Sequence, residues 1–422
     1  MPGRGGSQLM GPVTEMASVW LQLAFWLLAL GSGSLSLDES YRRQVTFEYN
    51  PGWDSSMPAA PNVLHIRALG PSDTIHYLWS SLGAPTVLQV YSSSPNSTLH
   101  VDWSRLQLPD PAGAIRIEPA EAVVYSTAVI FSRLLEYDDE NDTADMSQVP
   151  ADRIYPPYQL QDFTWADANA TLNQTTLTAQ LQGCNATGTP FVNGTITFRI
   201  TAFEGAGRDA DLPRLFHTAN TSKLEFVIEG LQPRGNRSRF GLELMVLEEA
   251  GTQRSMRVSK TIDDEYTPSI FKVTELVGAP ENGSSQRGFL QWKPVAYGAA
   301  PPLRSNSMQS RDYGLRTGHN CSLPTASLAF AFGRTVPTRH THLNAFNVSF
   351  GSASQWLYPT HHHISWSVLV GHGAPPEDTF SVLVVAIMAV GLGLPAVLLL
   401  VGGVYVCIHR SRLSHTGYQP IN

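Results

Sequence analysis

Thr195-Ile196-Thr197-Phe198-Arg199-Ile200 alternates polar and apolar side chains without interruption. A period of two directs successive side chains to opposite faces of an extended chain, so this segment is expected to be a β-strand with one face in a core. The same alternation recurs between residues 38 and 370, where clusters of Gly, Pro, Asn and Ser separate the runs. A convincing long amphipathic helix is absent from this region, which indicates an all-β ectodomain of antiparallel strands.

Seven further segments share the alternation and are expected to be strands: 45–49, 63–67, 86–91, 223–228, 240–246, 346–350 and 364–370. Their number predicts two antiparallel β-sandwich-like domains, covering residues 37–212 and 213–375. Gly205, Gly207 and Pro213 favour that boundary. Proline-rich stretches at 150–157 and 294–302 are alternative positions for the domain boundary.

The N-terminal segment, residues 1–36, has the layout of a secretory signal peptide. Arg4 precedes an apolar run at 19–30, and small residues follow at 31–36. The run is short for a membrane span, although an uncleaved anchor is the alternative interpretation. We therefore predict cleavage between about residues 31 and 37 and exclude the segment from the fold.

A second apolar segment, residues 379–408, is predicted to be a transmembrane helix. No charged residue occurs between Phe380 and Ile408, a span longer than the roughly 20 residues that cross a bilayer. Glu377 and Asp378 precede it, whereas arginines follow it at 410 and 412. Because positive charge favours the cytosolic side, residues 409–422 are expected to form a cytosolic tail. The chain is thus predicted to be a single-pass type I membrane protein.

Potential N-glycosylation sites provide an independent test of this topology. Eleven of 16 asparagines begin an Asn-x-Ser/Thr sequon, whereas roughly three would be expected by chance under the motif rule. All eleven lie between the two apolar segments, which predicts that this region is lumenal. The sequons begin at Asn96, Asn141, Asn169, Asn173, Asn185, Asn193, Asn220, Asn236, Asn282, Asn320 and Asn347.

Charge and cysteine content limit which binding partners and which cellular compartment are expected. The formal net charge is -7 and the basic residues are scattered, so nucleic acid is not an expected partner. Only four of the 28 basic residues are lysines. In an oxidising lumen Cys184 and Cys321 most simply form one disulfide, although two unpaired thiols are the alternative. Cys407, at the end of the apolar segment, is either palmitoylated or inert.

The C-terminal tail carries a candidate sorting motif. Tyr418 is followed three residues later by Ile421, and Gly417 precedes the tyrosine directly. An extended peptide of this kind can insert both side chains into pockets of a clathrin adaptor complex. Such a pattern arises often by chance, but a position close to the end of a short tail favours lysosomal sorting.

Histidines and acidic runs are the candidate metal-binding, pH-sensing or catalytic residues of the sequence. Histidines occur at 340, 342, 361, 362, 363 and 372, where a zinc site, a response to lysosomal pH and ordinary surface imidazoles are the three interpretations. The surface interpretation is favoured because no suitably spaced acidic or cysteine ligand is nearby. The acidic runs 136–140 and 263–265 are expected to be exposed, since the first adjoins Asn141.

Short catalytic motifs are absent from the sequence. It contains no Gly-x-Ser-x-Gly elbow, no His-Glu-x-x-His helix and no phosphate-binding glycine loop. No cofactor and no metal are expected, and the absence of enzymatic activity is an expectation that the family resemblance described below implies. Carboxylate pairs assembled from distant strands would leave no local signature, so a lumenal hydrolase or ligand-binding ectodomain is the alternative function.

The sequence as a whole resembles the glycosylated lysosomal membrane protein family. The resemblance rests on the segment 38–50 (DESYRRQVTFEYN), the dense sequons, the membrane span and the terminal segment 417–422 (GYQPIN). It implies a lysosomal membrane location and a non-catalytic accessory role. Members of this family accompany a lysosomal transporter of the major facilitator superfamily that exports dipeptides, and protect it from lumenal proteolysis. A sequon-free surface near residues 355–372 would favour this function over a hydrolase.

Overall fold

The computed structural model describes residues 41–54, 62–184, 194–249, 251–260, 272–280, 287–317, 327–332, 342–354, 358–377 and 382–414. The chain divides into two compact units, and the one from Glu39 to Asp378 is called the β unit below. The second comprises Met1–Asp38 and Thr379–Asn422. The predicted all-β region followed by one apolar C-terminal helix is confirmed. The predicted signal peptide lies outside the described residues.

Strand formation follows the alternation seen in the sequence. In β1 (Gln44–Tyr49) Val45 and Phe47 are buried, whereas Gln44, Thr46 and Glu48 are exposed. All eight segments expected to be strands are strands in the structure. A half-buried strand of this kind places its apolar face on the core and its polar face in water.

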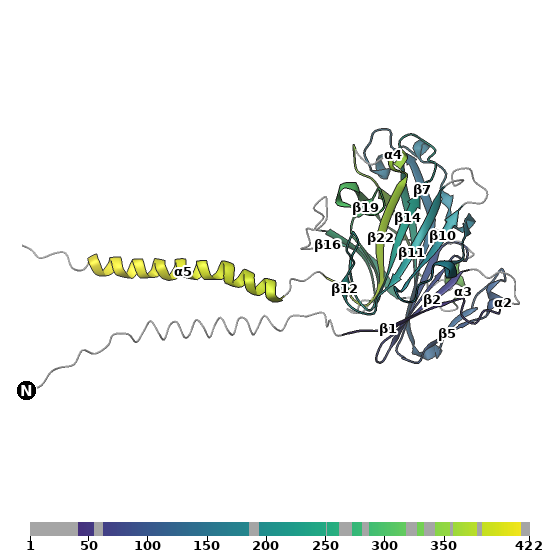
Figure 1. Ribbon diagram of the computed structural model, residues 1–422, viewed down its shortest axis with the longest axis horizontal. Coiled ribbons are helices and arrows are strands. Elements are labelled where there is room, and N and C mark those ends of the chain that lie inside the picture. Colours follow the sequence, from purple (N-terminus) through teal and green to yellow (C-terminus); the bar gives the residue numbers. More distant parts are fainter. Residues whose placement is uncertain are drawn as a thin grey trace, which may run out of the picture. The chain divides into compact units, whose positions relative to one another are not determined.

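Eighteen of the described strands belong to one hydrogen-bonded system that forms two antiparallel layers (Figure 1). The first sheet has the order β1, β2 (Val63–Leu69), β3 (Thr74–Ser80), β4 (Thr86–Ser92), β7 (Val123–Asp138), β15 (Ser238–Glu248), β21 (His342–Phe350) and β20 (Ser307–Thr317). The short β8 (Tyr158–Gln159) pairs with β7.

The second sheet has the order β9 (Thr164–Trp165), β10 (Thr178–Cys184), β11 (Thr195–Ala202), β14 (Thr221–Glu229), β22 (His363–His372), β18 (Gly288–Trp292), β17 (Lys272–Pro280) and β16 (Thr252–Lys260). A short strand, β19 (Val295–Tyr297), pairs with β22 of the second sheet and with β20 of the first. The two sheets are thereby joined along one side.

Aromatic rings from the two sheets meet in the space between them. The ring centroids of Phe131 in β7 and Phe198 in β11 are 5.0 Å apart. Trp292 in β18 stacks on Phe346 in β21, with centroids 5.6 Å apart. Such contacts are typical of a β-sandwich in which side chains of the two inner faces interdigitate. The sandwich is therefore packed along these contacts.

A second apolar cluster covers the outer face of the first sheet. Leu78 and Leu88 of the sheet pack in it with Trp103, Leu106 and Phe332. These last residues lie in or beside α2 (Trp103–Leu106) and α3 (Leu328–Ala331), next to the hairpin of β5 (Thr98–Val101) and β6 (Ile115–Glu118). Because both of its faces are covered, every residue of β3 is buried.

Smaller elements complete the β unit. A hairpin of β12 (Gly207–Arg208) and β13 (Phe216–His217) stands apart from the two main sheets, and α4 (Tyr358–His361) precedes β22. Short 3-10 helices occur at Ala120–Ala122, Met146–Gln148, Ala151–Arg153, Leu160–Asp162, Ala168–Thr171 and Arg304–Asn306.

The structure places no domain boundary between residues 212 and 213. β11 and β14, which flank that position, are paired along their whole length, from Thr195 opposite Glu229 to Ala202 opposite Ser222. β7 pairs with β15, so strands from both expected domains also share the first sheet. The expected pair of sandwich domains is therefore replaced by one β unit with a shared core.

The C-terminal helix α5 (Val382–Ser414) is long and apolar enough to cross a membrane. Pro395 lies inside it without ending it, which membrane helices tolerate when neighbouring groups satisfy the freed backbone. The helix continues six residues past the expected end of the span at residue 408. Nothing between His409 and Ser414 is a helix breaker, whereas Gly417 follows shortly after.

Candidate functional site

The sequon asparagines in the described residues lie at the surface of the β unit. Five of these seven are exposed and two, Asn220 and Asn347, are partly exposed. The exposed ones are Asn96, Asn141, Asn169, Asn173 and Asn236. The other four sequons, at Asn185, Asn193, Asn282 and Asn320, lie outside the described residues. Glycans on the described positions would project from elements of both sheets.

The first acidic run, residues 136–140, is not the exposed loop that the sequence suggested. Glu136 is 0 % exposed and Asp139 is 1 % exposed, whereas Glu140 and Asn141 face solvent. The prediction was wrong because the adjoining sequon indicates exposure of Asn141 alone. Glu136 lies in β7 and Asp139 follows its last residue, and both are paired with polar side chains of β15, Ser238 and Arg239 respectively.

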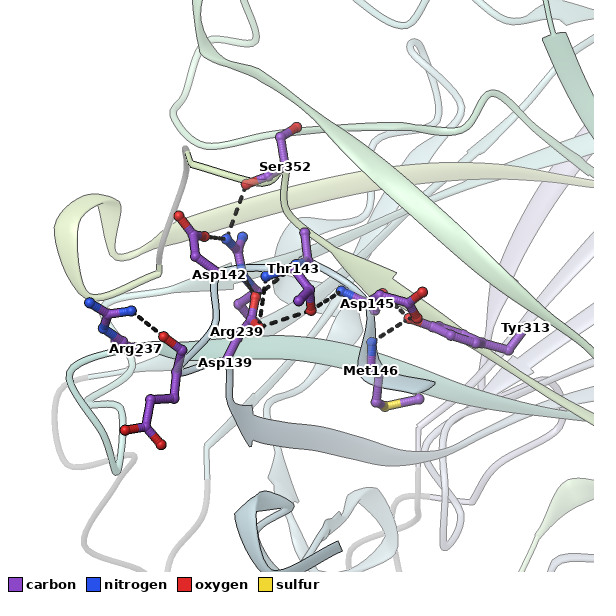
Figure 2. A network of polar contacts seen from close by, with 12 residues as sticks. Asp139, Asp142, Thr143, Asp145, Met146, Arg237, Arg239, Tyr313 and Ser352 are labelled. Carbon is purple, nitrogen blue, oxygen red and sulfur yellow. Dashed lines mark hydrogen bonds and ion pairs between the residues drawn. The ribbon is translucent and has the colours of Figure 1, made fainter. Parts of the chain in front are cut away.

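Arg239 of β15 is the centre of this buried network (Figure 2). Its Nε donates to Asp139 Oδ2 over 2.7 Å, and its Nη2 pairs with Asp142 Oδ1 and donates to the Ser352 carbonyl. Gly351 passes so close that an added Cβ would lie 2.1 Å from Arg239 Nη1. The guanidinium therefore occupies space that only a glycine leaves open.

Asp139 in turn holds the loop that carries the Asn141 sequon. Its carboxylate accepts hydrogen bonds from the Thr143 amide and hydroxyl and from the Ala144 amide, over 2.7 to 3.1 Å. Thr143 is the third residue of the sequon, so the hydroxyl faces inward while Asn141 faces solvent. Further along the loop, Tyr313 accepts a hydrogen bond from the Met146 amide over 2.7 Å (Figure 2).

These hydrogen bonds determine the protonation of Asp139. Burial raises the pKa of a carboxyl, but the hydrogen bonds from Thr143, Ala144 and Arg239 outweigh burial here and leave the pKa of Asp139 below its usual value of 3.8. Asp139 is consequently ionised at the acidity of a lysosome, and the ion pair with Arg239 persists there.

A second sequon loop is built beside the first. Asn236 is exposed, whereas Ser238, the third residue of its sequon, is buried and donates to Glu136 Oε1 over 2.6 Å. The Arg237 carbonyl accepts a hydrogen bond from the Asp139 amide over 3.2 Å, which links the two loops. The arrangement places two glycan acceptors on adjoining loops, each held by a buried carboxylate.

The described histidines differ in exposure. His361 and His362 are exposed, whereas His363 is buried at the start of β22. Burial lowers the pKa of His372 to about 4, and it also lowers the pKa of His361 and of His363. The pH-response interpretation loses support at His372, because a pKa near 4 leaves its imidazole largely neutral near pH 5. His340 and the side chain of His342 lie outside the described part of the chain.

Ser97, His76 and His65 form a hydrogen-bonded chain that no local sequence pattern indicates. Ser97 Oγ lies 2.8 Å from His76 Nε2, and His76 Nδ1 lies 2.9 Å from His65 Nε2. The order of groups resembles a nucleophile, a base and an orienting residue. Ser97 is 0 % exposed, however, so its hydroxyl is closed to substrate. These hydrogen bonds pair the buried polar side chains of Ser97, His76 and His65 with one another.

Other predicted sites are only partly covered by the structure. In the described residues no three His, Cys, Asp or Glu side chains gather as metal ligands. Cys184 is exposed with a free thiol at the end of β10, and Cys321 lies outside the described residues, so the disulfide remains a prediction. Tyr418 and Ile421 also lie outside them.

A small polar pocket lies on the second sheet beside the last residues of the β unit. It has a volume of about 170 Å³ and is lined by Leu215, Phe216, Ser259, Lys260, Val273, Glu275, Gln291, Lys293, Pro376 and Glu377. Gln291 Nε2 donates to Glu275 Oε1 over 3.1 Å and to the Pro376 carbonyl over 2.8 Å. No local sequence pattern indicates this pocket, because its lining residues come from segments far apart in the chain.

Comparison with known proteins gives the family. The family described as glycosylated lysosomal membrane protein matches residues 62–413. This chain belongs to that family. Glycosylated lysosomal membrane protein B of Xenopus laevis is 46 % identical over 407 residues, covering 96 % of this chain and 98 % of the relative. The Danio rerio relative is 42 % identical, covering 97 % and 100 %, and the Homo sapiens relative is 40 % identical, covering 95 % and 96 %.

Membership in the glycosylated lysosomal membrane protein family has two consequences for the site. The chain is a protein of the lysosomal membrane, with α5 as the candidate span among the described residues. The surface asparagines and the buried networks beneath them belong to a glycoprotein. The family name states a location and a modification, and names no reaction.

Proposed function

We propose that this protein is a non-catalytic accessory subunit that stabilises a lysosomal dipeptide transporter of the major facilitator superfamily and protects it from lumenal proteolysis. The observation that carries the proposal is the outward display of sequon asparagines from both sheets of one compact β unit. Glycans on such positions would hinder proteases sterically, both on the β unit and on lumenal loops that it covers.

The interior of the β unit supports a role in binding and shielding. Aromatic contacts such as Phe131 with Phe198, and Trp292 with Phe346, occupy the space between the sheets. The buried ion pair of Arg239 with Asp139 fixes the loop that carries Asn141, and the buried hydrogen bond from Ser238 to Glu136 fixes the loop that carries Asn236. A rigid unit exposes few local openings to a protease, because cleavage requires local unfolding of the chain.

The proposal includes a type I orientation with a cytosolic tail. The β unit would face the lumen, α5 would span the membrane, and Tyr418 and Ile421 would bind clathrin adaptor complexes. The charge asymmetry around the apolar segment and the position of the sequons support this orientation. Exchange of Tyr418 for Ala should shift the protein from lysosomes to the plasma membrane, and unchanged delivery would contradict the sorting role.

The direct test of the proposal is the lifetime of the transporter. In cells from which this protein has been deleted, pulse-chase labelling should show faster loss of the transporter, and lysosomal protease inhibitors should restore its lifetime. Re-expression of the full chain should also restore it. An unchanged transporter lifetime after deletion would overturn the proposal and favour assays of the β unit for hydrolysis or ligand binding.

A further inference from the structure

The edge strand β16, whose only paired strand among the described residues is β17, meets a polar pocket and the end of the β unit at one end of the second sheet. We propose that an extended lumenal segment of the membrane partner adds to β16 as a further strand and places one side chain in the adjoining pocket. This inference rests on the proposed function, because the occupant is a segment of the transporter.

β16 has an edge that can accept another strand. Among the described strands, only β17 pairs with β16. Val258, near the end of β16, is 58 % exposed. An unpaired strand edge presents a row of backbone donors and acceptors, which an extended peptide can satisfy by β-augmentation. An apolar side chain beside that edge adds area for the incoming strand to cover.

Buried ion pairs hold β16 in place. Arg254 pairs with Glu248 of β15, and the side chains of both residues are at most 1 % exposed. Arg257 pairs with Glu275 on the neighbouring strand β17. A strand held at two points loses little conformational entropy when a partner pairs with it, which favours binding.

The pocket adjoins the C-terminal end of this edge. Ser259 and Lys260 of β16 line it. Its interior carries Lys293 and Glu275, which are 2 % and 1 % exposed, beside the amide of Gln291. A volume of about 170 Å³ accommodates one side chain. Charged groups of both signs with an amide suit a polar side chain of the incoming segment.

The position of the pocket in the chain favours a partner embedded in the membrane. Pro376, whose carbonyl accepts from Gln291, and Glu377 both line the pocket. Only residues 378–381 separate Glu377 from Val382, the first residue of α5. Since consecutive Cα atoms are 3.8 Å apart, this link reaches at most about 19 Å. Glu377 is thus tethered within that distance of the first residue of α5, which favours an occupant that is itself held in the membrane.

Within the sequence, no sequon begins in β16 or at a residue that lines the pocket. The segments proposed to dock therefore carry no glycan acceptor of their own.

The test compares two exposed strand valines in the full-length protein in lysosomal membranes. Val258 lies on the proposed edge, and Val124 in β7 of the first sheet is similarly exposed, at 52 %. A photoreactive amino acid at position 258 should cross-link to the transporter, whereas one at position 124 should not. The substitution Val258→Lys should lower the co-purified transporter at least about fivefold, and Val124→Lys should leave it unchanged.

The outcomes separate this inference from the proposed function. If the unmodified chain retains no transporter, the proposed function fails, and the docking inference fails with it. If the unmodified chain retains the transporter but both lysine variants retain it equally, the edge is not the docking surface and the accessory role stands. Cross-links from position 258 to a second copy of this chain alone would also overturn the inference.

Discussion

Arg239 donates from Nε to Asp139 Oδ2 over 2.7 Å, although the two residues are 100 positions apart and their side chains are 0 % and 1 % exposed. Breaking a buried ion pair by removing one partner leaves a charge without compensation. The pair also fixes the loop of Asn141, because the same carboxylate binds Thr143 and Ala144. Stability and glycan presentation are therefore coupled at this site.

Replacement of Arg239 by Met should destabilise the β unit by about 3–5 kcal/mol, because Asp139 would remain buried and ionised. Urea unfolding of the full chain in detergent, followed by tryptophan fluorescence, measures this change. The control is Arg199→Ala, which breaks the more exposed pair of Arg199 and Glu225 and should cost at most about 1 kcal/mol. Equal losses in the two variants would contradict the account of the buried network.

Three substitutions distinguish the effect of the Asn141 glycan on stability from the effect of the hydrogen bond between Thr143 and Asp139. Asn141→Gln removes the glycan alone, Thr143→Ala removes both the glycan and the hydroxyl bond to Asp139, and Thr143→Ser keeps both. Electrophoresis should show one glycan fewer in the first two variants. The free energy of unfolding should fall by about 1 kcal/mol more in Thr143→Ala than in Asn141→Gln. Identical stabilities in those two variants would show that the hydroxyl contributes nothing.

The stability of the β unit should decrease as the pH falls from 6.5 towards 4. His372 stacks on Tyr91 with ring centroids 4.0 Å apart, and its surroundings include Arg43, Asp73 and Arg287. Burial and then Arg43 lower its pKa to about 4, against a partial opposing effect of Asp73. Between pH 6.5 and 4 the unfolded chain takes up a proton that the folded protein excludes, so folding is disfavoured; below about pH 4 both take it up and the decrease stops.

His372→Phe keeps an aromatic ring on Tyr91 and removes the titration. The loss of stability between pH 7 and pH 5 should become smaller by on the order of 1–2 kcal/mol. Asp139 does not contribute over this range, because its lowered pKa confines its effect to pH values below about 3.8. A pH profile unaffected by His372→Phe would contradict the assignment.

Local patterns predicted the strands but not their partners. The alternation in β1 and β11 follows from burial on one face of a strand and can be read from neighbouring residues. The pairing of β7 with β15 joins segments about a hundred residues apart, and no local pattern specifies it. The expected boundary at residues 212 and 213 was wrong because turn residues between β11 and β14 end one strand without ending the sheet.

Exposure was also predicted wrongly where a sequon adjoins buried residues. Asn141 indicates exposure of its own side chain, yet Asp139 two positions earlier lies in the interior. Within the segment 355–372, where a sequon-free surface would favour docking, residues 363–372 form β22, which is almost wholly buried between β14 and β18, whereas His361 and His362 are exposed. The polar pocket at Pro376 draws on five separate stretches of chain and only the fold brings them together.

The most direct test of the central claim is affinity purification of the full-length protein from lysosomal membranes in mild detergent, with quantitative mass spectrometry of the retained proteins. The accessory-subunit account predicts a major facilitator superfamily transporter in stoichiometric amount. Recovery of the glycoprotein without a multi-span transporter would contradict it.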